Sequence, residues 1–229
     1  AAGVLTVDFT VTDRDMNPVL TIPAVNGTIA KLVPATGGDA SNSWVNYTYR
    51  TQTVMGTGSW PAPDGTSAEQ ATNDTMGTFT NHGDGTYTYV FATNLMTAMR
   101  GGALVGYDPT LTHRVVIAMG GHSGATANAF LQFRPDGMPV TETRNIVETA
   151  TCQHCHGENE FHGHGGDRIT VESCVNCHNP GNIDPHGGET LDFRVMIHRI
   201  HAGSELATIP GADGIVWDDL IKGRDQADS

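Results

Sequence analysis

The sequence contains few basic residues: 12 Lys and Arg stand against 25 Asp and Glu, which gives a formal net charge of −13. Proteins that bind nucleic acid neutralise its phosphates with a basic face, so we expect no nucleic acid partner. Long apolar runs are also lacking, because no stretch approaches the roughly 18 to 20 residues of a membrane-spanning helix. Cysteine occurs only four times in 229 residues, so the positions of these four residues restrict the possible cysteine-dependent sites.

All four cysteines lie in two runs of the same form, Cys-x-x-Cys-His. The runs read Cys152-Gln153-His154-Cys155-His156 and Cys174-Val175-Asn176-Cys177-His178. This form is typical of covalent haem c attachment. Two thiols three residues apart lie about one helical turn apart, so each can add to one vinyl group of the same porphyrin. The following histidine then ligates the iron. We therefore predict two covalently attached haem c groups, with His156 and His178 as proximal iron ligands.

A zinc site and a pair of disulfides are alternative uses of the same thiols. Cys155 and Cys174 are separated by 18 residues, a spacing that also fits a four-cysteine zinc site. Neither alternative requires a histidine directly after both cysteine pairs, whereas haem attachment does. Haem is therefore the leading interpretation. Because covalent haem attachment takes place outside the bacterial cytoplasmic membrane, we expect a periplasmic or exterior location.

Residues 1–148 alternate strand-like patterns with turn clusters, and the 28 Gly and 11 Pro of the chain favour short elements. In the run 86–91 the aromatic residues Tyr87, Tyr89 and Phe91 alternate, which places them on one face of a strand. The predicted strands are 4–11, 28–33, 44–53, 86–91, 113–119, 129–133 and 144–150. Such short strands indicate a mainly β domain, an antiparallel barrel or sandwich, over residues 1–148.

Turns and two short helices are expected between these strands. Residues 81–85 and 135–137 are hairpin signals. Residues 67–70 fit a capping box, and Asn94 is placed to cap a helix over 95–100. Residues 13–17 resemble the opening of a calcium loop, but Pro18 and Ala24 stand where that loop needs Gly and Glu, so we predict a turn.

The composition changes at Thr149, and we predict a second, small domain over residues 149–229. From there to Gly188 the chain has little helical or strand periodicity, so covalently bound porphyrins would serve as its core. A helix is predicted over 190–202, with Thr190 as N-cap and Gly203 as the stop. The expected second domain is therefore a loop-rich, partly helical dihaem domain.

Distal iron ligands must come from histidines outside the two motifs. The helix residues His198 and His201 are three apart and project from nearly the same face, so each serves a different iron or one is not a ligand. Of His162 and His164, one is expected to be a ligand and the other solvated or bonded to a propionate. Two imidazoles on each iron would give six-coordinate centres suited to electron transfer, with no open site for substrate.

The remaining histidines, three arginines and four aromatic residues are expected to have other roles than iron ligation. We expect His154 and His186 not to be ligands, and His82, His113 and His122 to be surface or turn residues of the β-domain. Arginines at 168, 194 and 199 are placed either to pair with haem propionates or to be exposed. Trp44, Tyr47, Tyr49 and Trp60 are expected in the core rather than at a ligand site.

Several of these segments resemble outer-membrane multihaem cytochromes of the OmcA/MtrC family. The resemblance lies in residues 174–180, 184–185 and 192–203 of the haem region, and in residues 83–91, 112–115 and 146–148 of the β-part. It implies a split-barrel β-domain followed by a multihaem domain with bis-histidine irons. In that family His164, His198 and His201 would be distal ligands. The resemblance also implies a cell-surface location and electron export to minerals, flavins or partner cytochromes.

The chain differs from the family pattern because it has only two attachment motifs. This count is compatible with a fragment of a longer protein, a reduced member, or one unit of an assembly whose chains share haems. The leading hypothesis is an electron carrier with two bis-histidine haems rather than an enzyme. It would pass electrons to extracellular acceptors, such as metal oxides or flavins, or to partner cytochromes or an outer-membrane conduit. The alternatives are a subunit of a haem-bridged assembly or filament and a haem peroxidase or reductase with an open axial site.

Overall fold

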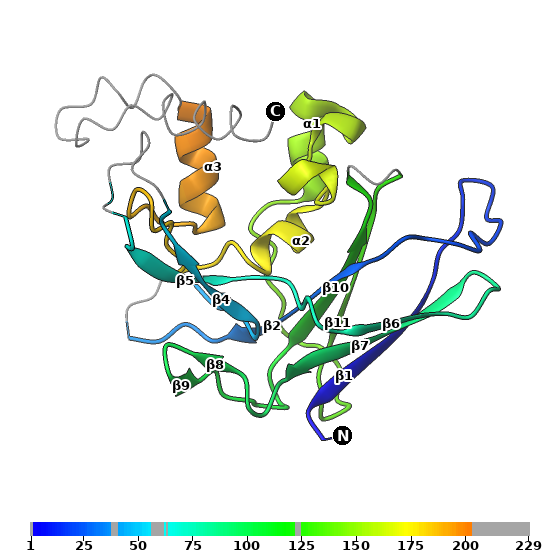
Figure 1. Cartoon of the computed structure of the whole chain (residues 1–229), viewed down its shortest axis with the longest axis horizontal. Coiled ribbons are helices and arrows are strands. Elements are labelled where there is room, and N and C mark those ends of the chain that lie inside the picture. Colours follow the sequence, from blue (N-terminus) through cyan, green and yellow to red (C-terminus); the bar gives the residue numbers. More distant parts are fainter. Residues whose placement is uncertain (1, 38–40, 56–61, 63, 122–124, 203–229) are drawn as a thin grey trace. The chain divides into compact units, whose positions relative to one another are not determined.

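The computed structural model describes the chain except for residues 1, 38–40, 56–61, 63, 122–124 and 203–229, drawn in grey in Figure 1. It divides into two compact units, residues 1–50 with 71–177 and residues 51–70 with 178–229. In chain order the elements are β1 (Val4–Thr10), β2 (Asn26–Val33), β3 (Ser43–Asn46), β4 (Tyr49–Thr53), β5 (Ser67–Ala71), β6 (Thr78–Asn81), β7 (Thr86–Asn94), β8 (Met99–Arg100), β9 (Ala103–Leu104), β10 (His113–Met119), β11 (Ala127–Phe133), α1 (Thr149–Glu160), η2 (His164–Gly166), α2 (Val171–Val175) and α3 (Phe193–Ala202).

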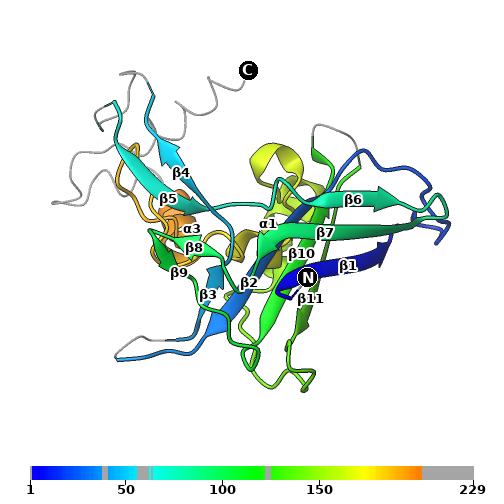
Figure 2. The ribbon, with the colours of Figure 1, turned by 60° about the horizontal axis from the view of Figure 1, so that its bottom comes forward.

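The first unit is built on two antiparallel sheets, with strand orders β1-β7-β6 and β11-β10-β2-β3 (Figure 2). Their facing side chains form the hydrophobic core, whose buried members are Ile29, Tyr47, Tyr89, Phe91, Leu95, Ala98, Val115 and Ile117. The mainly β, antiparallel character predicted from the sequence is confirmed. Among the described residues, no helix is long and apolar enough to cross a membrane.

Five of the predicted strands agree well with the structure. Strand β10 has the predicted bounds 113–119, and β1, β2, β7 and β11 differ from the prediction by at most a few residues. In β7 the side chains of Tyr87, Tyr89 and Phe91 are buried while their neighbours are more exposed, as a strand with one core face requires. The predicted hairpin joins β6 to β7, and Gly83 at its tip has φ 81°, which favours glycine.

The predicted strand 44–53 is two strands, β3 and β4, because the chain bends after Asn46. The Asn46 side-chain oxygen accepts the Thr48 backbone N–H at 2.7 Å, a local turn that ends β3 and precedes β4. The predicted strand 144–150 is wrong, because Thr149 begins α1. Residues 134–137 form the expected turn, with the Gly137 N–H donating to the Arg134 carbonyl, but no strand follows it in the described part.

Both short helices predicted in this region are wrong. Residues 67–70 belong to β5, which pairs with β4, because the strand partner satisfies their backbone groups better than a four-residue helix can. Asn94 caps a turn instead of a helix: its side-chain oxygen accepts the Met96 N–H at 2.9 Å. The chain then forms the short hairpin of β8 and β9.

The expected turn and core aromatics are confirmed where the structure describes them. The Asp13 carboxylate accepts the N–H groups of Asp15 and Asn17, both at 2.9 Å, and closes the turn that the sequence indicated in place of a calcium loop. Trp44 and Tyr47 are buried and Tyr49 is half-buried, whereas Trp60 and His122 lie outside the described residues.

The two central strands of the four-stranded sheet, β2 and β10, are buried on both faces. Alternate residues of β10, such as Val115 and Ile117, face the core between the sheets. The opposite face of this sheet is covered by residues 166–177, and we call it the outer face. Two of its groups, the Thr28 hydroxyl and the Arg114 carbonyl, accept hydrogen bonds from the Asn176 amide at 3.1 and 3.3 Å.

His113 is not a surface residue, contrary to the prediction. Its side chain is 0% exposed, and its Nε2 lies 2.8 Å from the Tyr47 hydroxyl while Nδ1 lies 2.9 Å from the Leu111 carbonyl. The carbonyl can only accept, so Nδ1 carries the proton and Nε2 accepts from Tyr47. Burial lowers the pKa of His113 from its ordinary 6.5, so the folded protein holds a neutral imidazole.

This burial predicts an acid-dependent loss of stability that His113→Gln reduces. As pH falls below about 6.5, the unfolded chain binds a proton that the buried imidazole rejects, which costs up to about 1.4 kcal/mol per pH unit. We expect the free energy of unfolding, measured with urea between about pH 7 and pH 5, to vary less with pH in the variant. His82→Gln, at an exposed histidine, is the control and should keep the original slope. Parallel profiles for His113→Gln and the unsubstituted protein would rule this effect out.

Candidate functional site

The first Cys-x-x-Cys-His motif lies on α1, which the weak periodicity of the sequence had not indicated. Cys152, Cys155 and His156 follow one another along this helix, which places the two thiols about one turn apart. Gly157 interrupts the helix directly after the motif, with φ 74° and ψ 167°. Cys155 and His156 are exposed, and the His156 ring centroid lies 6.1 Å from that of Phe161.

The cysteines of the second motif lie at the end of α2, in more buried surroundings. The Thr170 hydroxyl caps this helix by accepting the Ser173 N–H at 3.3 Å. The Cys177 N–H donates to the Cys174 carbonyl at 3.1 Å, so the helical turn carries both thiols. Burial raises the pKa of Cys174 to about 12 and that of Cys177 to about 11, so both are neutral thiols.

The starts of α1 and α2 are joined through one hydroxyl group. Thr149 Oγ1 donates to Glu172 Oε2 at 3.0 Å and accepts the Val171 N–H at 2.9 Å. Glu172 is only 6% exposed, so this bond satisfies a buried carboxylate. The helices that carry the two cysteine pairs are thus fixed to each other at their first turns.

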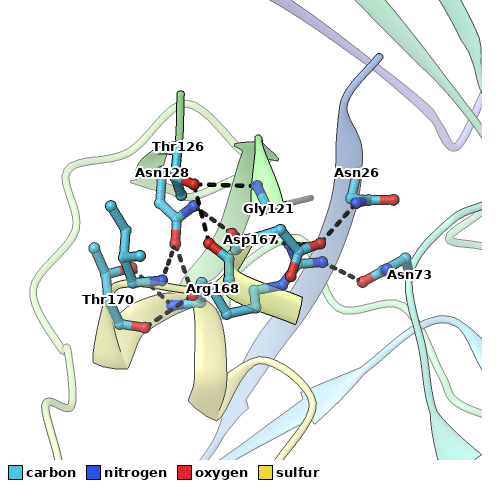
Figure 3. Close-up of polar contacts among 11 residues, drawn as sticks. Asn26, Asn73, Gly121, Thr126, Asn128, Asp167, Arg168 and Thr170 are labelled. Carbon is cyan, nitrogen blue, oxygen red and sulfur yellow. Dashed lines mark hydrogen bonds and ion pairs between the residues drawn. The ribbon is translucent and has the colours of Figure 1, made fainter. Parts of the chain in front are cut away.

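A polar network attaches the segment before α2 to the outer face of the sheet (Figure 3). On β11 the Asn128 amide donates to the Asp167 carbonyl at 2.8 Å and accepts the Ile169 N–H at 2.9 Å. Thr126 donates to the Gly166 carbonyl at 3.0 Å. The segment approaches so closely that a Cβ on Gly121 would lie 2.8 Å from the Gly165 carbonyl oxygen.

The side chains of Asp167 and Arg168 complete this network. Asp167 accepts from Asn26 Nδ2 at 3.0 Å and from Arg168 at 3.1 Å. Arg168 also donates to Asn73 Oδ1 at 2.7 Å, and it is only 6% exposed. Its charge acts on the thiols of Cys174 and Cys177.

The second unit contains three of the predicted iron ligands, and each uses Nδ1 in the same way. His178 Nδ1 lies 3.2 Å from the Leu191 carbonyl. On α3, His198 Nδ1 lies 2.6 Å from the Arg194 carbonyl, and His201 Nδ1 lies 2.9 Å from the Ile197 carbonyl. A carbonyl only accepts, so Nδ1 carries the proton and the lone pair lies on Nε2, the tautomer of a histidine that ligates through Nε2.

The beginning of α3 differs from the prediction. The helix starts at Phe193, and Asp192 rather than Thr190 caps it: the Asp192 carboxylate accepts the Arg194 N–H at 3.0 Å. Thr190 instead accepts the Asp192 N–H at 3.2 Å, just before the helix begins. The predicted stop at Gly203 lies outside the described residues. His198 and His201 are both exposed on this helix.

Comparison with known proteins places this arrangement in a family. The family model for outer membrane cytochrome MtrC/MtrF-like, domains II/IV, matches residues 144–219. Over 173 residues, or 72% of this chain, the sequence is 30% identical to multiheme cytochrome MtrC of Shewanella baltica (strain OS185), of which it covers 23%. The fold matches the crystal structure of the outer membrane decaheme cytochrome OmcA with a TM-score of 0.76 and 28% identity, over 90% of this chain and 32% of that chain. MtrC from Shewanella baltica OS185 gives a TM-score of 0.62 and 27% identity, over 88% of this chain and 31% of that chain.

The chain belongs to the OmcA/MtrC family. It spans about a third or less of the length of these relatives. The resemblance inferred from the motifs is confirmed, and the mainly antiparallel β fold with few helices is shared with OmcA and MtrC. These relatives are outer-membrane multihaem cytochromes, in agreement with the extracellular or outer-membrane location expected from the sequence.

In this member of the OmcA/MtrC family, the structure also describes the remaining histidines of the haem region and the arginines considered for haem propionates. His164 lies in η2 with φ 53° and is exposed, as are His154 and His162. His186 Nδ1 lies 2.9 Å from an oxygen of Asp184. The three arginines that we considered for propionates each pair with a nearby carboxylate: Arg168 with Asp167, Arg194 with Asp192, and Arg199 with Glu189.

The thiols do not adopt either alternative arrangement. All four cysteines are described, and none is in a disulfide. In the described part of the chain, no three His, Cys, Asp or Glu side chains gather closely enough to hold a metal ion. Each motif thus carries two unlinked thiols and an adjacent histidine, a donor set that fits covalent haem attachment.

From these contacts with the sheet we predict that Asn128→Ala destabilises the segment that carries the second motif. The change leaves the Ile169 N–H and the Ser173 hydroxyl, 3.1 Å from Asn128 Oδ1, without this acceptor, so we expect a loss of about 2 to 4 kcal/mol. Urea unfolding measures the loss, and amide hydrogen exchange should increase over residues 166–177. Gln132→Ala on the same strand, where the bond to Thr143 is exposed, is the control and should change little. Equal effects of both changes would contradict the role given to Asn128.

Proposed function

We propose that this chain is an electron-transfer c-type cytochrome that carries two haem c groups, attached through Cys152 and Cys155 and through Cys174 and Cys177. The observation that carries the proposal is the pair of Cys-x-x-Cys-His motifs in a member of the OmcA/MtrC family. When bound, haem supplies a one-electron couple at iron. The protein contributes the attachment thiols, the axial imidazoles and the surroundings that tune the couple.

In this proposal His156 and His178 are the proximal ligands, and His164, His198 and His201 are the distal candidates. The Nδ1–carbonyl bonds of His178, His198 and His201 support it, because they orient each ring and put the lone pair on Nε2. Two irons need only two distal ligands, so one of the three distal candidates is surplus in the isolated chain. It would be a structural histidine or would ligate a haem of another polypeptide.

We propose the same division of the chain as the sequence indicates: a split-barrel β-domain over residues 1–148 and a dihaem domain over residues 149–229. The change of composition at Thr149 and the likeness to OmcA and MtrC support it. The compact units of the fold divide the chain differently, because hydrogen bonds attach residues 166–177 to the sheet. The division proposed here follows the chemistry of the segments rather than their packing.

The proposed partners are other multihaem cytochromes or an outer-membrane conduit, with metal oxides or flavins as final acceptors. The names of the relatives, outer-membrane and multihaem cytochromes, support a role in electron transfer at the cell surface. No observation favours a haem enzyme with an open axial site or a haem-bridged filament over this role.

The stoichiometry of haem tests the proposal directly. Protein matured in a host that attaches haem c should contain two haems per chain by pyridine haemochrome assay and intact mass. Cys152→Ala with Cys155→Ala, and separately Cys174→Ala with Cys177→Ala, should each leave one. A colourless product with the polypeptide mass alone would refute the proposed function.

The distal ligands can be identified by single changes. Of His164→Ala, His198→Ala and His201→Ala, we expect two to convert one iron each from low-spin six-coordinate to a carbon monoxide-binding form, because two irons need two distal imidazoles. Absorption spectra of the ferrous protein with and without carbon monoxide measure this. His162→Ala and His82→Ala are controls that should leave both irons low-spin. No change in any of the three variants would exclude this ligand set.

A further inference from the structure

One side chain of the β-domain contacts the second haem-attachment motif directly at sulfur. Asn46, the last residue of β3, is 0% exposed. Its Nδ2 lies 2.9 Å from the Asn176 carbonyl oxygen and 3.4 Å from Cys177 Sγ. These residues are 130 and 131 positions away in the sequence, so only the fold brings the amide to the thiol.

The orientation of the Asn46 amide is determined by its own turn. The side-chain oxygen accepts the Thr48 backbone N–H at 2.7 Å. An N–H can only donate, so this bond identifies the oxygen end of the amide and leaves the NH₂ end facing the motif. The group next to Cys177 Sγ is therefore a hydrogen-bond donor.

The loop between the two cysteines is held to the same face of the sheet. The Asn176 amide donates to Thr28 Oγ1 at 3.1 Å and to the Arg114 carbonyl at 3.3 Å, and Asn176 is 0% exposed. In the first motif the two residues between the cysteines are less buried: Gln153 is half-buried and His154 is exposed. The sheet thus encloses the second motif more closely than the first.

A donor at this sulfur would keep its role after haem attachment. A thioether sulfur has lone pairs but no hydrogen, so it can accept the Asn46 N–H and cannot donate. The positive end of the amide dipole points toward the sulfur through which the haem would be attached. A fixed dipole of this sign stabilises an added electron, and hydrogen bonding near the cofactor is one of the means by which proteins tune haem potentials.

A buried positive charge acts in the same direction. Arg168 is 6% exposed, and its charge acts on both Cys174 and Cys177. Its hydrogen bonds to Asp167 and to Asn73 keep the guanidinium in place (Figure 3). The neighbouring Asp167 carboxylate offsets part of this charge, whereas the Asn46 amide bonds to the sulfur directly.

We propose that Asn46 is a positioning residue for the second haem: its N–H holds the Cys177 sulfur and raises the reduction potential of that haem above that of the first. This inference rests on the proposed function, because it requires haem at both motifs. Its consequence is that the second haem is reduced first, and an electron that enters the chain resides there.

The experiment is a redox titration of the two-haem protein, followed by electron paramagnetic resonance, which separates the two ferric sites. The variants that lack one cysteine pair assign the signals. We expect Asn46→Leu to lower the ferrous-to-ferric ratio of the second haem about threefold to tenfold at a fixed ambient potential, or about 30 to 60 mV at 59 mV per tenfold. Asn46→Asp replaces the donor with an acceptor of the same shape, so it should lower the ratio at least as far. The first haem should not change.

Thr28→Val is the matched control. It is nearly isosteric, lies on the same face of the sheet and removes the bond to Asn176, but Thr28 does not contact the sulfur. It should destabilise the motif without moving either potential. An equal shift in Thr28→Val would overturn the proposal, since the effect would then come from loop docking.

Each remaining outcome also decides the question. If Asn46→Leu does not accumulate with two haems, Asn46→Asp carries the test, and the order of the two potentials in the unsubstituted protein is a third readout. Reduction of the first haem before the second overturns the proposal. Two haems with unmoved potentials in the Asn46 variants reject the role of Asn46 but leave the proposed function intact. Absence of haem rejects the proposed function itself.

Discussion

The fold of this unit depends on the hydrogen-bonded contact between the outer face of the four-stranded sheet and residues 166–177. These residues have too few apolar side chains to fold alone, so their backbone groups need partners from elsewhere. Asn128 of the sheet supplies both a donor and an acceptor, and Asn46 and Asn176 bind across the same contact. Because polar groups on both sides are buried, the contact is favourable only in the register that pairs them.

The sheet also buries a charged group, the Arg114 guanidinium, and its desolvation costs free energy. The guanidinium is fully buried beneath the Trp44 ring, at 4.1 Å from the ring centroid, and only Nη2 hydrogen-bonds, to the Arg144 carbonyl and to Asn145. Within the described residues, Nε and Nη1 have no hydrogen-bond partner. Burial lowers the pKa of Arg114 to about 10, so the group remains charged at neutral pH. The aromatic face and the charge of buried Glu172 offset part of the desolvation.

Local sequence patterns predicted secondary structure correctly where the burial of a strand face dominated. They failed where a contact with a residue distant in the sequence determined the conformation. The strand β7 was readable because buried aromatic residues alternate along it, and β10 was readable as a short, largely apolar run. Residues 67–70 looked like a helix start, yet pairing with β4 made them a strand. The bend at Asn46 and the burial of His113 were missed because nothing in their neighbouring sequence reveals a turn that faces Cys177 or a bond to Tyr47.

The sequence by itself revealed the two Cys-x-x-Cys-His motifs and the family resemblance, because two thiols and a histidine within five residues form a motif whatever the rest of the chain does. It also indicated the mainly β body, since alternation is a local property of a strand. Only the tertiary structure decided which motif is enclosed by the sheet, which donor meets the Cys177 sulfur and which nitrogen of His198 bears the proton. The first two depend on residues more than a hundred positions apart, and the third on a helical carbonyl whose position exists only once the backbone is folded.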